Sequence, residues 1–248
     1  MLTGSADIET LAGNAATIPK YFAEPIVFQH TLLLQTVMEM RNGAREAVLP
    51  PSLHPTVPPT LSMQVWQVGE SPWGAFAMAV ARVSCRGGVR ARGFTTGVAA
   101  STDAAIQGLR DHLGYPARRA DVAFTASYSG VEASVAESGQ ETYQASAIDP
   151  VPLGADDVQY TGTLNLAHTP NGLRLVQVEF HLEPQRVERL QARLQAFAPA
   201  AWGNRRLDPY HVVAASLAGG TVTFPPLRFL LRPDELAFTG TERIAGKT

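Results

Sequence analysis

The sequence predicts an α+β fold that consists mainly of β-strands with few helices. Most apolar residues fall in short segments that are typical of strands. Only two segments carry apolar residues at helical spacing, and both lie between strand segments. The chain has 248 residues, 45% of them hydrophobic, which is enough for a large core. We expect one domain over residues 1–248, with residues 1–20 as a loosely ordered N-terminal extension.

The expected strands follow a cluster of prolines. Five prolines between residues 50 and 59 exclude a helix interior or a central strand there and indicate a rigid loop. Alternation with a period of two is clearest in residues 173–182, and Asn171-Gly172 just before them is a strong hairpin signal. The expected strands are residues 61–68, 74–84, 94–98, 122–128, 131–136, 142–147, 159–166, 173–182 and 221–231.

Two helices are expected. The first begins at a cap in residues 101–103, places Ile106, Leu109 and Leu113 on one face, and ends at Gly114. The second follows Pro184 and carries four apolar residues on one face, namely Val187, Leu190, Leu194 and Phe197.

The composition excludes several classes of protein. The formal net charge is −2 and only 17% of residues are charged, so the basic footprint of a nucleic-acid-binding protein is absent. No apolar run is long enough to span a bilayer, and the N-terminal segment lacks the pattern of a secretory signal. We therefore expect a soluble cytoplasmic protein. Cys85 is the only cysteine and the six histidines lack zinc-site spacing, so we expect no metal and no cofactor.

One segment combines a strand, a helix and a short motif. Residues 97–122 read as a strand, a capped helix and then Leu113-Gly114-Tyr115-Pro116-Ala117-Arg118-Arg119. This segment resembles the acetoacetate decarboxylase family, in which a helix is followed by Tyr-Pro-Lys-Lys and the first lysine forms a Schiff base. Residues 44–50 look like the family's short helix ending in Val-x-Pro, and residues 208–236 look like its closing strand pair.

The resemblance runs in order over residues 28–236. It implies a closed β-barrel or double sheet with few helices around a central cavity, and it implies a homo-oligomer. The family's chemistry needs an unprotonated lysine. Here Ala117 stands at that position with Arg118 beside it, and the only lysines are Lys20 and Lys247. Because a guanidinium stays protonated, arginine does not replace the amine. We therefore expect a divergent member without Schiff-base chemistry.

Three residues are candidates for catalysis. Arg118 either points into the cavity and binds a carboxylate or enolate, or it lies on the surface paired with Asp121. Glu39 ends an apolar stretch and is a general acid or base if it is buried. His211 enters an apolar strand and is the histidine that we expect to be most buried.

Five further residues are candidates for substrate binding. Gln64 lies on the strand face opposite Met63 and Val65, which is the inward face in the family, or else it faces solvent. Met78 maps to a polar family position and packs or lines the pocket. Trp66 lines the pocket or only packs. The remaining candidates are Tyr115, as a proton donor, and Arg41, which lies near the position of a family arginine.

These residues support three hypotheses about function. The first is a small-molecule enzyme on a repurposed decarboxylase scaffold, which performs a lyase, cyclase, dehydratase or isomerase step on a keto- or enone-containing metabolite, for example a polyketide-like compound of secondary metabolism. The second is a non-catalytic small-molecule binding protein. The third is a lysine-independent β-keto acid decarboxylase. The expected partner is a small-molecule substrate, with no nucleic acid and no membrane. A titratable group in the pocket separates catalysis from binding alone.

Overall fold

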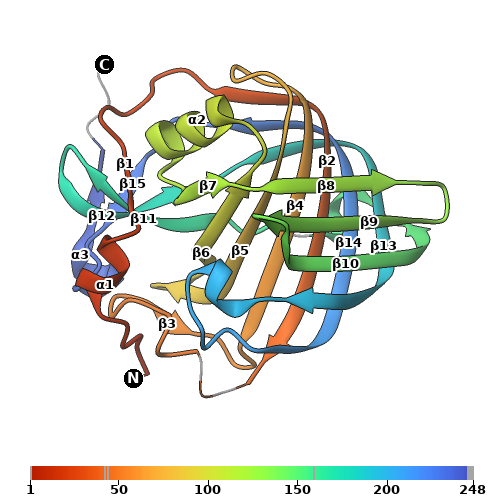
Figure 1. Cartoon of the computed structure of the whole chain (residues 1–248). Helices are drawn as coiled ribbons and strands as arrows, with labels where there is room; N and C mark the ends of the chain where they lie inside the picture. The colour runs from red at the N-terminus through yellow and green to blue at the C-terminus, as the bar shows by residue number, and fades with distance from the viewer. Residues whose placement is uncertain (1, 42, 44, 159, 245–248) are drawn as a thin grey trace.

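The computed structural model describes residues 2–41, 43, 45–158 and 160–244, and its strands form one large mixed sheet (Figure 1). Two short 3-10 helices, η2 (Ala155–Asp157) and η3 (Pro199–Trp202), accompany three α-helices, α1 (Ile8–Ala12), α2 (Asp103–Leu113) and α3 (Ala237–Gly240). The strands are β1 (Ala16–Thr17), β2 (Ile26–Met40), β3 (His54–Pro55), β4 (Thr60–Glu70), β5 (Phe76–Gly87), β6 (Arg90–Ala100), β7 (Ala117–Arg119), β8 (Asp121–Ala126), β9 (Gly130–Glu137), β10 (Gln140–Pro152), β11 (Thr163–Thr169), β12 (Gly172–Val178), β13 (His181–Phe197), β14 (Pro209–Phe224), β15 (Phe229–Leu231) and β16 (Thr241–Arg243).

The sheet is open, so the expectation of a closed barrel is wrong. Its hydrogen-bonded order is β16-β15-β12-β11-β6-β5-β4-β2-β14-β13-β10-β9-β8, with β1 on β11, β3 on β5 and β7 on β6. Among the described residues the end strands β8 and β16 do not pair with each other, as closure of the sheet would require. Instead, β8 lies against β4, β5 and β6, where Val122 and Phe124 pack on the core. The sheet thus folds back on itself as a mainly-β double layer. A central cavity stays a prediction.

The two faces of β4 belong to two separate cores. Met63 and Val65 point into the first core, which lies between the two layers and includes Tyr143 and Trp202. Trp66 alternates with them and points into the second core, on the opposite face. This alternation decides which polar side chains can meet, because Gln64 shares the face of Trp66.

Helix α2 confirms the first helix prediction and covers part of the second core. The side chain of Thr102 caps its N-terminus by accepting a hydrogen bond from the backbone N–H of Ala105, and Gly114 ends it at φ 66°. Leu109 and Leu113 are buried in the second core. Gly108 lets the indole of Trp73 lie directly against the helix, because an added Cβ would stand 2.1 Å from the ring.

The second predicted helix is wrong, because residues 181–197 form strand β13 between β10 and β14. The apolar residues that have helical spacing lie on two faces of the strand. Leu190 and Leu194 pack with the first core, whereas Val187 is buried elsewhere. Register shifts within this stretch and just before it break the simple alternation that would have indicated a strand. Pairing along both edges therefore outweighs local helix propensity.

Two further expectations about the N-terminal part of the chain are corrected. The segment before residue 20 is not loose where it is described, since β1 pairs with β11 and Ile18 is buried. Backbone hydrogen bonds also join Gly4 and Ala6 to the chain near Leu49 and Leu53. The short helix expected over residues 44–50 is a turn at residues 45–48, and Ala44 lies outside the described residues.

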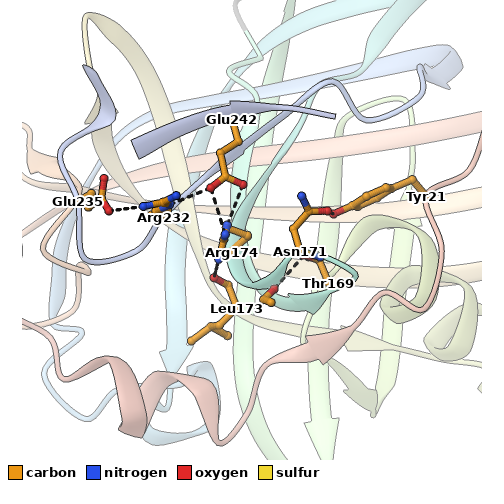
Figure 2. A network of polar contacts seen from close by, with 9 residues as sticks. Tyr21, Thr169, Asn171, Leu173, Arg174, Arg232, Glu235 and Glu242 are labelled. Carbon is orange, nitrogen blue, oxygen red and sulfur yellow. Dashed lines mark hydrogen bonds and ion pairs between the residues drawn. The ribbon is translucent and has the colours of Figure 1, made fainter. Parts of the chain in front are cut away.

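A network of charged residues attaches edge strand β16 to β12 (Figure 2). The guanidinium of Arg174 donates two hydrogen bonds to Glu242, both of 3.1 Å, from Nε and Nη2. Arg232 donates a third to Glu242, of 2.8 Å, and pairs with Glu235. These hydrogen bonds, with Arg174 contributing most, lower the pKa of the Glu242 carboxyl.

We expect acid to loosen β16 through Glu242. A carboxyl whose pKa is lowered on folding stabilises the fold above its unfolded pKa of about 4.3, and this stabilisation is lost as the pH falls through the folded pKa. Glu242→Gln should therefore raise amide hydrogen exchange in residues 229–231 and 241–243 at neutral pH and abolish the acid-dependent part of that exchange. Glu235→Gln is the matched control, because among the described residues the side chain of Glu235 accepts a hydrogen bond only from Arg232. Equal exchange in the two variants would contradict this role.

Candidate functional site

A row of polar side chains crosses the second-core face of the sheet. Ser216 of β14 stands opposite Gln35 of β2 in the register, and Gln35 stands opposite Gln64 of β4. Ser62 of β4 stands opposite Arg82 of β5. All five are buried within a face that is otherwise apolar. The fold therefore brings together polar groups from four neighbouring strands.

The guanidinium of Arg82 connects this row to the segment that precedes β11. Its Nη2 donates to Oε1 of Gln35 at 3.0 Å, an oxygen that also accepts a bond of 2.7 Å from Nε2 of Gln64. Its Nε donates to Ser62 Oγ at 3.2 Å, and its Nη1 donates to the carbonyl oxygen of Thr161 at 2.9 Å. Each Nη atom makes one hydrogen bond within the described part of the chain. One N–H on each therefore remains without a hydrogen bond among the described residues.

Arg82 is a buried cation without a carboxylate partner among the described residues. It is 2% exposed, and every group that it contacts is neutral. Burial lowers its pKa to about 10, so it stays protonated at neutral pH. Other arginines are paired, for example Arg92 with Glu179 and Arg118 with Glu137. An uncompensated buried charge is unfavourable, so Arg82 is a ready site for an anion.

Two tyrosines lie near Arg82, and both stay neutral. Burial raises the pKa of Tyr115, against the opposing effect of its hydrogen bond with Thr163. Burial also raises the pKa of Tyr160, against its hydrogen bond with Ser216. Trp66, on the same face, has a buried Nε1–H without a partner among the described residues. The cluster thus offers one cation and several neutral donors, and its members named here include no carboxylate and no imidazole.

The segment that precedes β11 closes the cluster. The carbonyl of Thr161 accepts from Arg82, the hydroxyl of Tyr160 lies 3.4 Å from that of Ser216, and the carbonyl of Gly162 accepts from the backbone of Gly93. The ring of Tyr160 also packs on Phe180. Only a few polar contacts hold this cover over the guanidinium.

Four of the predicted substrate-binding residues come together here. Gln64 is 2% exposed and belongs to the polar row, so its solvent-facing alternative is wrong. Trp66 and Met78 stand opposite each other in the register and, with Tyr115, lie in the second core. Ala117, at the position that matches the family lysine, lies in the same core.

Arg118 lies apart from this cluster. It forms an ion pair with Glu137, donates to the carbonyl of Val98 and stacks 5.1 Å from the ring centroid of Trp202. The alternative prediction, that Arg118 pairs with Asp121, is wrong. Because Glu137 already supplies a carboxylate, Arg82 is the better candidate for binding a substrate oxygen.

The remaining candidates gather at the far end of β2 and β14. Glu39 is half-buried and stands opposite His211 in the register. His211 is exposed, so the expectation that it is the most buried histidine is wrong. The reason is that β14 begins at a solvent-exposed end of the sheet, where Tyr210 is also exposed. Arg41 pairs with Asp208 at 2.8 Å in solvent. None of these residues contacts the Arg82 cluster.

Sequence reasoning missed Arg82, although a signal was present. An arginine interrupts the apolar run of residues 78–83 within one of the expected strands. A charge in such a position is rare unless it is paired or functional. Its register partner Ser62 lies two residues before Gln64, which puts both side chains on the face assigned to the pocket.

The lysines, the cysteine and the possible metal ligands do not form a second candidate site among the described residues. Lys20 is exposed, and Lys247 lies outside the described residues. Burial raises the pKa of the Cys85 thiol to about 12, so this thiol is a poor nucleophile. Within the described ranges, no group of three or more His, Cys, Asp or Glu side chains is arranged to hold a metal ion. None of the helices described has the length and apolar character to cross a bilayer.

Comparison of the structure with solved structures identifies its fold. Acetoacetate decarboxylase from Legionella pneumophila matches with a TM-score of 0.73 and 18% identity, over 85% of this chain and 88% of that chain. The enduracididine biosynthesis enzyme MppR in complex with pyruvate matches with a TM-score of 0.68 and 15% identity, over 86% and 93%. An acetoacetate decarboxylase-like enzyme from Sphingomonas wittichii matches with a TM-score of 0.63 and 14% identity, over 82% and 91%. No protein-family model and no curated protein matches the sequence.

Proposed function

Because the chain has the acetoacetate decarboxylase-like fold, we propose that it is a small-molecule enzyme that acts on a keto- or enone-containing substrate without forming an imine. Arg82 holds the negatively charged oxygen of that substrate. The observation that carries the proposal is the buried guanidinium without a carboxylate partner among the described residues. A primary amine is missing from residues 21–246 of the sequence.

The chemistry that suits this cluster is stabilisation of charge on oxygen. In lyase, cyclase, dehydratase and isomerase steps on ketones, negative charge develops on the carbonyl oxygen as a neighbouring bond breaks or forms. The Arg82 fork lies in a dry, preorganised setting and stabilises that oxyanion, while a neutral phenol such as that of Tyr115 donates a hydrogen bond. Trp66 and Met78 form the apolar wall of the site and orient the substrate.

The carbonyl of Thr161 occupies the place that we assign to the substrate oxygen. It is the one backbone acceptor on the guanidinium of Arg82 among the described contacts. A carboxylate or enolate is a stronger acceptor than a peptide carbonyl. Binding therefore displaces Thr161 and moves the cover formed by Tyr160 to Gly162. That MppR is described in complex with pyruvate supports a keto acid as the class of ligand to test first.

A non-catalytic binding protein is the second candidate. The specific observation in its favour is that the described cluster contains no carboxylate or imidazole to accept a proton. The titratable groups of the cluster, Arg82, Tyr115 and Tyr160, are all proton donors. Lysine-independent decarboxylation of a β-keto acid needs no such base and stays open as a third candidate. Assembly into a homo-oligomer and a cytoplasmic location stay predictions.

The proposal predicts a saturable, non-covalent complex with enolisable ligands. Pentane-2,4-dione should give an enolate difference spectrum with the protein, and borohydride with acetoacetate or pyruvate should leave the intact mass unchanged. A mass increase after borohydride would overturn the imine-free mechanism. Absence of any spectral change would overturn the oxyanion site. Exchange of the pyruvate methyl protons in D2O, followed by NMR, separates the two leading candidates, because an enzyme accelerates this exchange and a binding protein does not.

A further inference from the structure

A cavity lined by arginines lies beside the Arg82 cluster. Its volume is about 300 Å³, at the lower end of the range for small-molecule pockets. Arg90 and Arg92 reach it from β6, Arg228 from the segment before β15, and Glu179, Phe180 and His181 from the junction of β12 and β13. Three guanidinium groups thus face one carboxylate.

The positive charge of this cavity is not balanced within the described structure. Arg92 is 9% exposed and pairs with Glu179 at 2.7 Å, and Glu179 also accepts from Gln177. Arg90 and Arg228 are exposed and form no ion pair in the parts of the chain that are described. The one carboxylate is therefore already used, and the two outer arginines present uncompensated charge to a ligand.

A thin wall separates this cavity from Arg82. Phe180 lines the cavity, and its ring centroid lies 5.3 Å from that of Trp66 and 5.9 Å from that of Tyr160. Gly162 packs so closely on Glu179 that an added Cβ would stand 2.4 Å from its carboxylate, while the neighbouring Thr161 carbonyl bonds to Arg82. The cover of the Arg82 cluster thus packs against Phe180 and Glu179, two of the residues that line the cavity.

We propose that this cavity binds a second anionic group, a carboxylate or phosphate, at the far end of the same substrate. This inference rests on the proposed function, because Arg82 is assigned the first anionic oxygen. When the Thr161 carbonyl leaves Arg82, the wall between the two sites opens. A ligand with acidic groups at both ends then spans from Arg82 to Arg90 and Arg228, with its chain against Phe180. The substrate class is therefore an elongated keto compound with two anionic ends.

Matched keto acids test the inference. 2-Oxoglutarate and 2-oxopentanoate have the same chain and differ only in the terminal carboxylate. Calorimetry should show the diacid bound about tenfold more tightly by the unmodified protein. The double variant Arg90→Gln/Arg228→Gln should bind both acids equally and keep its affinity for the monoacid. The control Arg193→Gln/Arg205→Gln makes the same charge change at exposed sites elsewhere and should keep the tenfold preference.

The outcomes separate this inference from the proposed function. Monoacid binding with no preference for the diacid, or a preference that survives in the Arg90/Arg228 variant, overturns the second anionic site alone. Failure of every protein to bind either acid overturns the Arg82 assignment and this inference with it. Inorganic phosphate that competes with the diacid but not with the monoacid supports the site. Stronger competition by phosphate than by acetate then identifies the end group as a phosphate.

Discussion

Substitution of Arg82 by methionine is expected to weaken the binding of keto-acid anions about 100-fold or more, while the free energy of unfolding stays within about 1 kcal/mol of the unmodified value or rises. Binding falls because the guanidinium that we assign to the substrate oxygen is lost from a buried site. Stability does not fall in parallel, because methionine is apolar and similar in length, and the face around the polar row is otherwise apolar. A purely structural arginine would show the opposite pattern.

The physical reason is the pKa of Arg82, which burial lowers to about 10, well below the ordinary value of a guanidinium. A base with a lowered folded pKa is charged in both states below that pKa, and there its charge disfavours folding. A difference of this size corresponds to about 3 kcal/mol at neutral pH. The fold regains this amount only as the pH rises above about 10, towards the ordinary pKa of a guanidinium. The stability that methionine recovers offsets the three hydrogen bonds that it removes.

The measurement combines urea unfolding with calorimetric titration of pyruvate. Arg174→Met is the matched control, because Arg174 is also mostly buried but has a carboxylate partner in Glu242. This control should lower the free energy of unfolding by about 1–2 kcal/mol and keep pyruvate binding. If Arg82→Met is strongly destabilised and still binds pyruvate, Arg82 is structural and the proposed oxyanion site is lost.

Gly108→Ala is expected to destabilise the fold by about 2–3 kcal/mol, although alanine normally improves a helix interior by up to about 1 kcal/mol. The added Cβ would stand 2.1 Å from the Trp73 ring, so the indole must leave its place against α2. Trp73 also packs on Phe28 and Phe76, with ring centroids 5.5 and 6.2 Å away, so its displacement disturbs the second core.

A double-mutant cycle checks this explanation. In a Trp73→Ala background the space is free, so Gly108→Ala should become neutral or stabilising, as helix propensity alone predicts. Ala104→Gly on the exposed face of α2 gives the ordinary propensity difference for the same helix. Equal destabilisation by Gly108→Ala with and without Trp73 would show that the close contact is not the cause.

Local signals in the sequence predicted the elements that local chemistry determines. The cap at Thr102 and the left-handed Gly114 define α2. Asn171 lies in the turn between β11 and β12, and Gly172 is the first residue of β12. The prediction of a helix at residues 187–197 failed because this segment pairs with β10 and β14 as an irregular strand. The apolar spacing of the segment alone does not reveal these partners. Likewise, no local pattern states that β8 packs over β4 instead of closing the sheet.

The candidate site was only half predictable for a related reason. Gln64, Met78, Tyr115 and Trp66 were proposed as binding residues from strand alternation and the resemblance, and they stay candidates. The role of Arg82 depends on the absence of an acid around it, and that is a property of the packed structure. Arg118 has the same chemistry and stands beside the matching motif, yet Glu137, 19 residues away along the chain, uses its charge.

The order of the strands also constrains how this protein is made. Strand β2, Ile26–Met40, leaves the ribosome well before one of its two neighbours, β14, Pro209–Phe224. A nascent chain must therefore keep an apolar strand half-paired until β14 has been synthesised, which favours slow folding and dependence on chaperones. Termination before residue 209 would leave Gln35 beside an unpaired edge, so the polar row is completed only after Ser216 has been added.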